Sequence, residues 1–135
     1  MMSTIYLAGP IFGRTTAECS NWRNEIKRDG RGHSFLDPTD RDFRGGEDQA
    51  YRGIVEGDKA DIRRCDIVIA NCQIRGSAGT SMEILYSYML EIPVIAIVGE
   101  KVSPWIRYHA SILVHNIDKV LDAIPLIKMR DRNER

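Results

Sequence analysis

Two acidic side chains, Asp58 and Glu83, stand where carboxylates can do chemistry. Helical spacing over residues 49–64 puts Asp58 in the middle of an apolar stripe, where a carboxylate needs a partner or a task. That stripe consists of Tyr51, Ile54, Val55 and Ile62. Glu83 follows Thr80 by three positions at the expected start of a helix, a capping-box spacing at which the helix dipole favours an ionised carboxylate. If both acids reach one place, one can donate a proton while the other acts as an anionic nucleophile.

Each acid also has a purely structural interpretation. Asp58 can pair with a buried arginine or a helix end, and Glu83 can serve only as a cap. The loop AGPIFG at 8–13 is as consistent with a tight strand-to-helix turn as with a ligand contact, because it matches neither the dinucleotide-binding nor the P-loop pattern. Spacing alone leaves these alternatives open.

Short apolar runs alternating with amphipathic stretches must position these residues. Strands are expected at 4–8, 33–36, 66–72, 92–98 and 111–115, and helices at about 16–28, 49–64, 80–90 and 117–127. The third and fourth runs are almost wholly apolar, as in central strands covered on both faces. The alternation predicts a single α/β domain with a doubly wound, five-stranded parallel sheet of order 2-1-3-4-5, the flavodoxin-like (Rossmann-like) arrangement.

Ligands of such sheets bind beyond the carboxyl ends of the strands. This rule directs attention to the loop after the first strand, in which Gly9, Pro10, Ile11 and Arg14 are candidate substrate contacts, and to Gly79. The polar segment Asp37–Asp48 is expected to be a long mobile loop of the kind that closes over ligands.

Composition limits the function classes. Nineteen basic residues balance nineteen acidic ones, so no global field draws the protein to nucleic acid or to a membrane, and the expected partner is a small molecule. Three cysteines without a CxxC pair are typical of reduced thiols. Because no basic and apolar leader precedes the first strand, we expect a cytoplasmic protein.

Four segments stand in an order that resembles the nucleoside 2-deoxyribosyltransferase superfamily: IYLAGPIFG at 5–13, Asp58 with DIVIAN at 66–71, SAGTSMEI at 77–84, and IPVIAIV at 92–98. The resemblance spans nearly the whole chain. It implies a domain over 1–128 with a charged tail at 129–135, no cofactor and no metal. It also implies a mechanism like that of retaining glycosidases, through a covalent glycosyl-enzyme.

By position in that family, Glu83 matches the nucleophile and Tyr6 the tyrosine that orients it. Asp58 matches the acid that protonates or holds the departing base. For Tyr6 an ordinary aromatic strand residue remains the alternative. The length of the Asp37–Asp48 loop and its Gly45-Gly46 pair lead us to expect that it closes over the base. We expect Phe43 to stack on the ring of the base and Arg41 and Arg44 to lie near a phosphate.

Transferases acting on free nucleosides commonly carry an aspartate six positions before the nucleophile, where this chain has Ser77. A carboxylate there would repel a 5′-phosphate, whereas a hydroxyl can donate a hydrogen bond to it. Ser77 therefore resembles the branch that hydrolyses nucleoside 5′-monophosphates. That branch also uses a partner-subunit serine in a Ser-x-x-Ile-Arg segment, matched here by Ser103–Arg107, which implies a homodimer with Ser103 supplied in trans. The alternative for both serines is an ordinary loop residue or a helix N-cap.

Three functional hypotheses follow. The first is an N-glycosidase of (2′-deoxy)ribonucleoside 5′-monophosphates. The second is a nucleoside 2-deoxyribosyltransferase that exchanges bases on free 2′-deoxynucleosides. The third is a non-catalytic nucleotide-binding module, which fold analogy alone never excludes.

Overall fold

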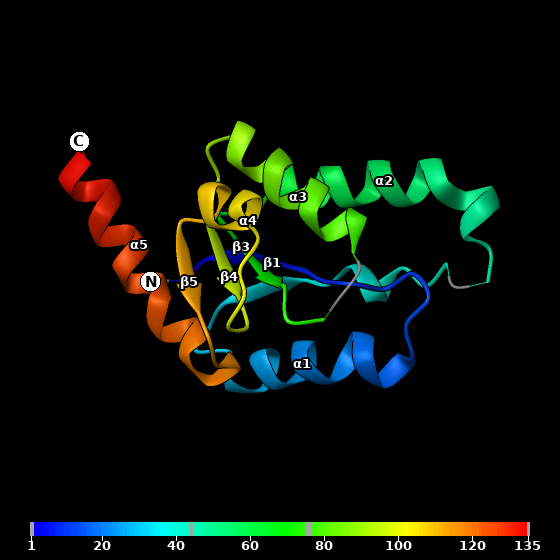
Figure 1. The fold of residues 1–135 in the computed structure, drawn as a ribbon, viewed down its shortest axis with the longest axis horizontal. Coiled ribbons are helices and arrows are strands. Elements are labelled where there is room, and N and C mark those ends of the chain that lie inside the picture. Colours follow the sequence, from blue (N-terminus) through cyan, green and yellow to red (C-terminus); the bar gives the residue numbers. More distant parts are fainter. Residues whose placement is uncertain (1, 44, 75–76, 135) are drawn as a thin grey trace.

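An all-parallel sheet runs through the centre of the molecule (Figure 1). Its strands are β1 (Thr4–Ala8), β2 (Ser34–Leu36), β3 (Ile67–Asn71), β4 (Val94–Ile97) and β5 (Ile112–Val114). The order β2-β1-β3-β4-β5 confirms the predicted flavodoxin-like arrangement in one domain. The structure is a computed structural model that describes the backbone of residues 2–43, 45–74 and 77–134 and the side chains as far as residue 127.

Helices cover both faces of the sheet. Helices α1 (Thr16–Asp29) and α5 (Val120–Glu134) lie on one face, and α2 (Glu47–Arg63) and α3 (Ala78–Met89) on the other (Figure 1). Burial on both faces explains why the central strands are nearly continuous β-branched and small apolar runs. Helix α5 continues to Glu134, beyond the expected end at residue 127, and the division of the chain at residue 128 stays a prediction.

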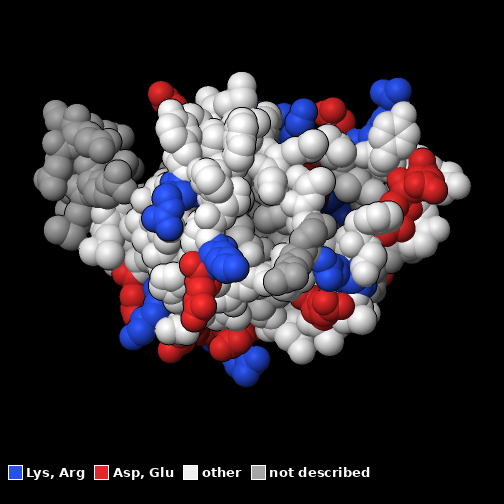
Figure 2. All heavy atoms as spheres, viewed as in Figure 1, with Lys and Arg blue, Asp and Glu red and all other residues white. Residues whose placement is uncertain are grey.

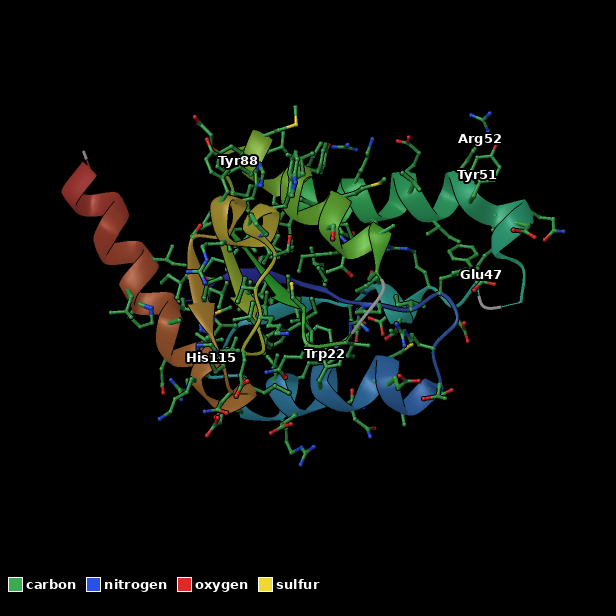
Figure 3. The ribbon with its side chains drawn as sticks, viewed as in Figure 1. Trp22, Glu47, Tyr51, Arg52, Tyr88 and His115 are labelled. Carbon is green, nitrogen blue, oxygen red and sulfur yellow. The ribbon has the colours of Figure 1, made fainter. Side chains whose placement is uncertain are left out.

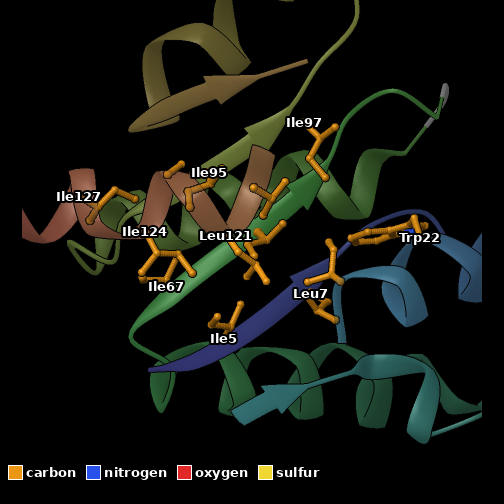
Figure 4. Packing of buried hydrophobic residues seen from close by; sticks show 13 residues of the cluster. Ile5, Leu7, Trp22, Ile67, Ile95, Ile97, Leu121, Ile124 and Ile127 are labelled. Atoms are coloured by element: carbon orange, nitrogen blue, oxygen red, sulfur yellow. The ribbon is translucent and has the colours of Figure 1, made fainter. Parts of the chain in front are cut away.

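The alternation of side chains along β1 decides which layer each residue meets. Ile5 and Leu7 point to the α1 and α5 side, where they pack with Trp22 in the larger core cluster (Figure 4). Tyr6 points the other way and belongs to the cluster under α2 and α3, with Ile62 and Ile84. The strand thus delivers Tyr6 to the helical layer that carries Asp58 and Glu83.

Helix α3 begins earlier than the sequence pattern suggested. Its N-cap is Ser77, whose side chain accepts the Thr80 backbone N–H at 3.0 Å. Glu83 consequently lies in the second turn, and the expected capping box between Thr80 and Glu83 is wrong. Both Ser77 and Thr80 can cap a helix, and the Glu83 side chain is engaged elsewhere.

The apolar stripe predicted on α2 is buried only toward its carboxyl end. Ile62 is fully buried, whereas Tyr51 and Val55 are 55% and 46% exposed, so the predicted apolar stripe is not a buried face at these two residues. A 17-residue helix is about 25 Å long, longer than the five-residue strands beneath it. The amino half of α2, with Tyr51 at its outer end, projects past the sheet (Figures 1 and 3).

The helix expected at 117–127 starts with the 3-10 helix η2 (Ile117–Lys119), which follows β5. Two other short elements, helix α4 (Pro104–His109) after β4 and the 3-10 helix η1 (Pro38–Asp40) after β2, were not predicted. Each is too short to show a periodic apolar pattern. In the part of the chain that is described, no helix combines the length and the apolar character that crossing a membrane requires.

Candidate active site

Tyr6 and Glu83 form the centre of the candidate site. Tyr6 is fully buried in β1, and its hydroxyl donates a hydrogen bond to Glu83 Oε2. Glu83 reaches this point from α3, which crosses the same face of the sheet. The structure therefore brings together two residues that the family resemblance paired.

Asp58 joins them from α2. Its half-buried carboxylate accepts a hydrogen bond from Arg41 Nη2 at 2.8 Å and interacts with the Tyr6 hydroxyl. The other guanidinium nitrogen of Arg41, Nη1, contacts Asp61 Oδ2 at 2.6 Å. Asp58 thus has the arginine partner of the structural interpretation. It also contacts the tyrosine next to Glu83, as the catalytic interpretation requires.

Burial controls the protonation of this cluster. Burial, and after it the negative charge of Asp58, raises the pKa of Glu83 to about 8, although the Tyr6 hydrogen bond opposes the rise. Burial also raises the pKa of Asp58 while the hydrogen bond from Arg41 opposes it. Glu83 is therefore mainly protonated at neutral pH in the free protein. The expectation that the helix dipole keeps it ionised is wrong, because the residue is desolvated and lies beyond the first turn.

Arg23 is a central residue that sequence analysis missed. Its fully buried guanidinium donates to three carbonyl oxygens, those of Leu7 at 3.2 Å, Gly9 at 3.0 Å and Cys19 at 2.6 Å. It also lies 3.7 Å from the buried carboxylate of Asp37, after β2. Arg23 thereby ties the carboxyl ends of β1 and β2 to α1.

A sequence signal for Arg23 existed. Arg23 falls on the same face of α1 as Cys19, Trp22 and Ile26, so it is a charge within an apolar stripe, as Asp58 is. Its guanidinium carbon lies 4.6 Å above the Trp22 ring, and Trp22 fills the space between α1 and the sheet (Figure 3). A Cβ at Gly9 would collide with that ring, which explains the glycine there.

The loop after β1 is held mainly from within. The Ile11 carbonyl accepts hydrogen bonds from Arg14 N at 3.1 Å and from Cys19 Sγ at 3.7 Å, and Gly13 has a φ of +72°. Pro10 is buried. Arg14 is half-buried and lies 3.7 Å from Glu18. Gly9, Pro10, Ile11 and Arg14 thus frame the carboxyl end of β1, while their contacts to a substrate stay a prediction.

The two predicted phosphate-site serines each cap a helix. The hydroxyl of Ser77 shares a 2.6 Å hydrogen bond with Thr80 Oγ1 in addition to its capping bond. Ser103 is exposed and accepts the Trp105 backbone N–H at 3.2 Å at the start of α4. Gly79 is exposed, and a Cβ there would meet open space. Among the described contacts no hydrogen bond joins Ser103 to Ser77 or to Glu83.

The segment Asp37–Asp48 is more structured than a simple loop. It opens with η1, and the Asp37 carboxylate at its start pairs with Lys27 and accepts the Thr39 N–H at 2.9 Å. Phe43 is half-buried. The Arg41 guanidinium lies on α2 against Asp58 and Asp61, and its approach to a phosphate stays a prediction. Arg44 lies outside the described residues.

Metal ligands do not gather anywhere in the described ranges. Within residues 2–43, 45–74 and 77–127, no group of three or more histidine, cysteine, aspartate or glutamate side chains is arranged to hold a metal ion. Asp58 and Glu83 instead meet around the Tyr6 hydroxyl.

Comparison with known proteins adds a family match. The model of the family described as nucleoside 2-deoxyribosyltransferase matches residues 5–121. A comparison with curated protein sequences found no match.

Three solved structures share the fold. A 2-deoxyribosyltransferase from Bacillus psychrosaccharolyticus has a TM-score of 0.72 at 23% identity, over 87% of this chain and 89% of that one. A 2-deoxyribosyltransferase from Leishmania mexicana has a TM-score of 0.59 at 23% identity, over 81% and 73%. The CMP N-glycosidase BcmB of Clostridium botulinum has a TM-score of 0.58 at 18% identity, over 90% and 98%.

Proposed function

The chain belongs to the nucleoside 2-deoxyribosyltransferase family, and on that premise we propose that it cleaves the N-glycosidic bond of a (2′-deoxy)ribonucleoside 5′-monophosphate. The products are a free base and a sugar phosphate. The observation that carries this proposal is the cluster in which the buried Tyr6 hydroxyl meets Glu83 with Asp58 beside it. A pair of acids with an orienting tyrosine suits nucleophilic displacement at a sugar carbon.

In the first step a carboxylate oxygen of Glu83 attacks C1′, and the bond between C1′ and the base nitrogen breaks. The electron pair of that bond leaves with the base, which takes up a proton with the help of Asp58. The sugar phosphate stays attached to Glu83 as an ester. In the second step water attacks C1′, the ester bond breaks, Glu83 is restored, and the proton of the water is released.

Glu83 must lose its own proton before it can attack. The Tyr6 hydroxyl faces both acids, so it offers a route by which that proton reaches Asp58 and from there the departing base. Asp58 then serves as the acid of the first step. The raised pKa values of both carboxyls support this exchange, since each can hold the proton near neutral pH.

The phosphate is assigned to the amino end of α3. Ser77 caps this helix, and the lack of a side chain at Gly79 leaves the first backbone N–H groups open to an anion. Arg14 and Phe43 complete the proposed substrate contacts, the first toward the phosphate and the second on the base.

We further propose that the enzyme is a homodimer in which Ser103 of the second copy also reaches the phosphate. The support is an apolar face made of Met82, Leu85, Tyr88, Met89, Trp105 and Tyr108, all exposed on α3 and α4. Figure 2 shows few charged side chains over this part of the surface. Trp105 is 71% exposed and follows the α4 cap at Ser103, so a partner covering the face would meet that serine.

A second candidate is base exchange on free 2′-deoxynucleosides. Two of the structural neighbours carry the name 2-deoxyribosyltransferase, which favours this alternative. The glycosyl-enzyme would be the same, and a second base would take the place of water. Ser77 favours the phosphorylated substrate, because it brings no negative charge to the 5′ side.

The test is a panel of nucleosides and their 5′-monophosphates, each incubated with the protein with and without an acceptor base. Free base and sugar phosphate formed from monophosphates without an acceptor would support the proposal. Turnover of nucleosides only when an acceptor base is present would replace it by the exchange reaction. Tight binding without turnover of any substrate would contradict both.

A further inference from the structure

The guanidinium group of Arg41 bridges two carboxylates on α2. Nη2 lies 2.8 Å from Asp58 Oδ1, and Nη1 lies 2.6 Å from Asp61 Oδ2. Arg41 follows η1, so it approaches the helix from the segment that leads out of the sheet after β2. One side chain therefore links that segment directly to an acid of the candidate site.

The surface of α2 is shaped to receive this guanidinium. A Cβ at Gly57 would lie only 3.0 Å from Arg41 Nε, so the glycine leaves the space that the side chain fills. Asp61 is 5% exposed and one turn further along, where it also accepts a hydrogen bond from Arg64 Nη2 at 2.8 Å. Burial opposes ionisation of Asp61, but the hydrogen bonds from Arg41 and Arg64 lower its pKa. Gly57 and Asp61 together form the binding site for the Arg41 guanidinium on α2.

These contacts are more specific than an ion pair that only holds a loop on the helix surface. Exposed ion pairs contribute little to stability, and a loop arginine could pair with any carboxylate on the surface of α2. Here the arginine is placed against Asp58, which also interacts with the Tyr6 hydroxyl. Asp58 and Glu83 repel each other when both are ionised, and the positive charge of Arg41 offsets that repulsion.

We propose that Arg41 is a positioning residue that holds the Asp58 carboxyl group in place for the departing base. Gly57 and Asp61 in turn fix the position of the Arg41 guanidinium. The inference rests on the proposed function, because it assigns Asp58 to the leaving group. Arg41 itself touches no reacting atom. Its effect on the reaction passes through Asp58.

Two glycines of α2 provide a matched experiment. Gly57→Ala pushes on Arg41 Nε, whereas a Cβ at Gly53, one turn earlier on the same helix, has nothing within 4 Å. Both changes favour the helix equally. On the best 5′-monophosphate substrate, we expect Gly57→Ala to lower kcat with little change in KM and Gly53→Ala to stay within about twofold of the wild type.

Changes at Arg41 supply the second arm. Arg41→Gln should lower kcat by up to about 100-fold, the scale of a misplaced catalytic group. Arg41→Lys should recover part of the loss, because an ammonium keeps the charge but does not bridge two carboxylates as a guanidinium does. Adding Gly57→Ala to Arg41→Gln should cost no further activity, since the alanine then has no guanidinium to displace.

The outcomes separate the inference from the proposed function. An inactive wild-type protein overturns both. If the wild type is active, two results would overturn the inference and leave the proposed function standing. One is a kcat of Gly57→Ala equal to that of Gly53→Ala. The other is an Arg41→Gln variant with a lower melting temperature and a wild-type kcat. Loss of kcat in Gly57→Ala and Arg41→Gln, with non-additivity in the double variant, supports the inference.

Discussion

The hydroxyl of Tyr6 donates a hydrogen bond to Glu83 across 77 positions of sequence, from the centre of the sheet to the helix above it. The contact places a phenol and a carboxylic acid in a buried setting where neither ionises readily. Burial, followed by the charges of Glu83 and Asp58, raises the pKa of Tyr6 far above its ordinary value. The tyrosine therefore remains a hydrogen-bond donor at any pH at which the protein works.

Replacing Glu83 by Gln should abolish turnover and preserve the fold. The amide keeps the shape and can still accept from Tyr6, but it is a poor nucleophile, so activity should fall by several orders of magnitude. Glu83 does not cap its helix, so no cap is lost. Thermal melting beside product formation checks this, together with mass spectrometry for a sugar adduct on the wild type. A normally folded Glu83→Gln variant with near-wild-type activity would refute the nucleophile.

The same substitution should raise stability at alkaline pH. The pKa of Glu83 rises from an ordinary 4.5 in the unfolded chain to about 8 in the folded protein. The unfolded chain therefore binds fewer protons between these values, and Glu83 lowers stability progressively as pH rises through that window. Urea unfolding at pH 5 and pH 9 should show a larger gain for Glu83→Gln at pH 9. An equal difference at both pH values would contradict the raised pKa.

The pH dependence of kcat/KM should show a descending limb near pH 8. The two acids must share one proton, which passes from Glu83 to Asp58 and then to the base, so activity should fall about tenfold per pH unit above the pKa of Glu83. Tyr6→Phe removes a hydrogen bond that lowers this pKa, so the limb should move to higher pH. Tyr86→Phe is a matched control on α3, because its hydroxyl accepts from Arg63 instead. A limb that stays in place in Tyr6→Phe would show that the hydrogen bond does not tune Glu83.

Ser77→Asp should discriminate against phosphorylated substrates without unfolding α3. Aspartate caps helices as well as serine does, so the amino end of the helix should persist. Like charges ~4 Å apart cost on the order of 4 kcal/mol at an effective dielectric near 20, which should weaken monophosphate turnover selectively. Kinetics on a monophosphate and on its nucleoside give the comparison. Equal losses on the two would remove Ser77 from the phosphate site.

Trans complementation should reveal the second subunit. Ser103→Asp and Glu83→Gln homodimers should each be nearly inactive, the first because a partner carboxylate repels the phosphate. Mixed dimers contain one site with a wild-type Glu83 and a wild-type Ser103 from the other chain. Random exchange of subunits should therefore restore about a quarter of wild-type activity. No recovery after demonstrated subunit exchange would place Ser103 outside the partner's site.

Local pattern was sufficient for the fold. The apolar runs around β1, β3 and β4 and the amphipathic stretches between them identified the strands and their order, because burial on both faces of a parallel sheet demands such runs. The helical wheel also marked Asp58 as a carboxylate on an apolar face. Arg23 carried the same mark on α1 and was overlooked. Helix α4 is too short to produce any periodic signal.

The sequence by itself determined where strands and helices lie and which polar residues fall on their apolar faces. These features depend only on residues that are close together in the chain. Only the tertiary structure decided that Arg41 meets Asp58 and that the pKa of Glu83 is raised to about 8. A pKa depends on how completely water is removed and on which charges are near. Those quantities arise when segments far apart in the chain pack together.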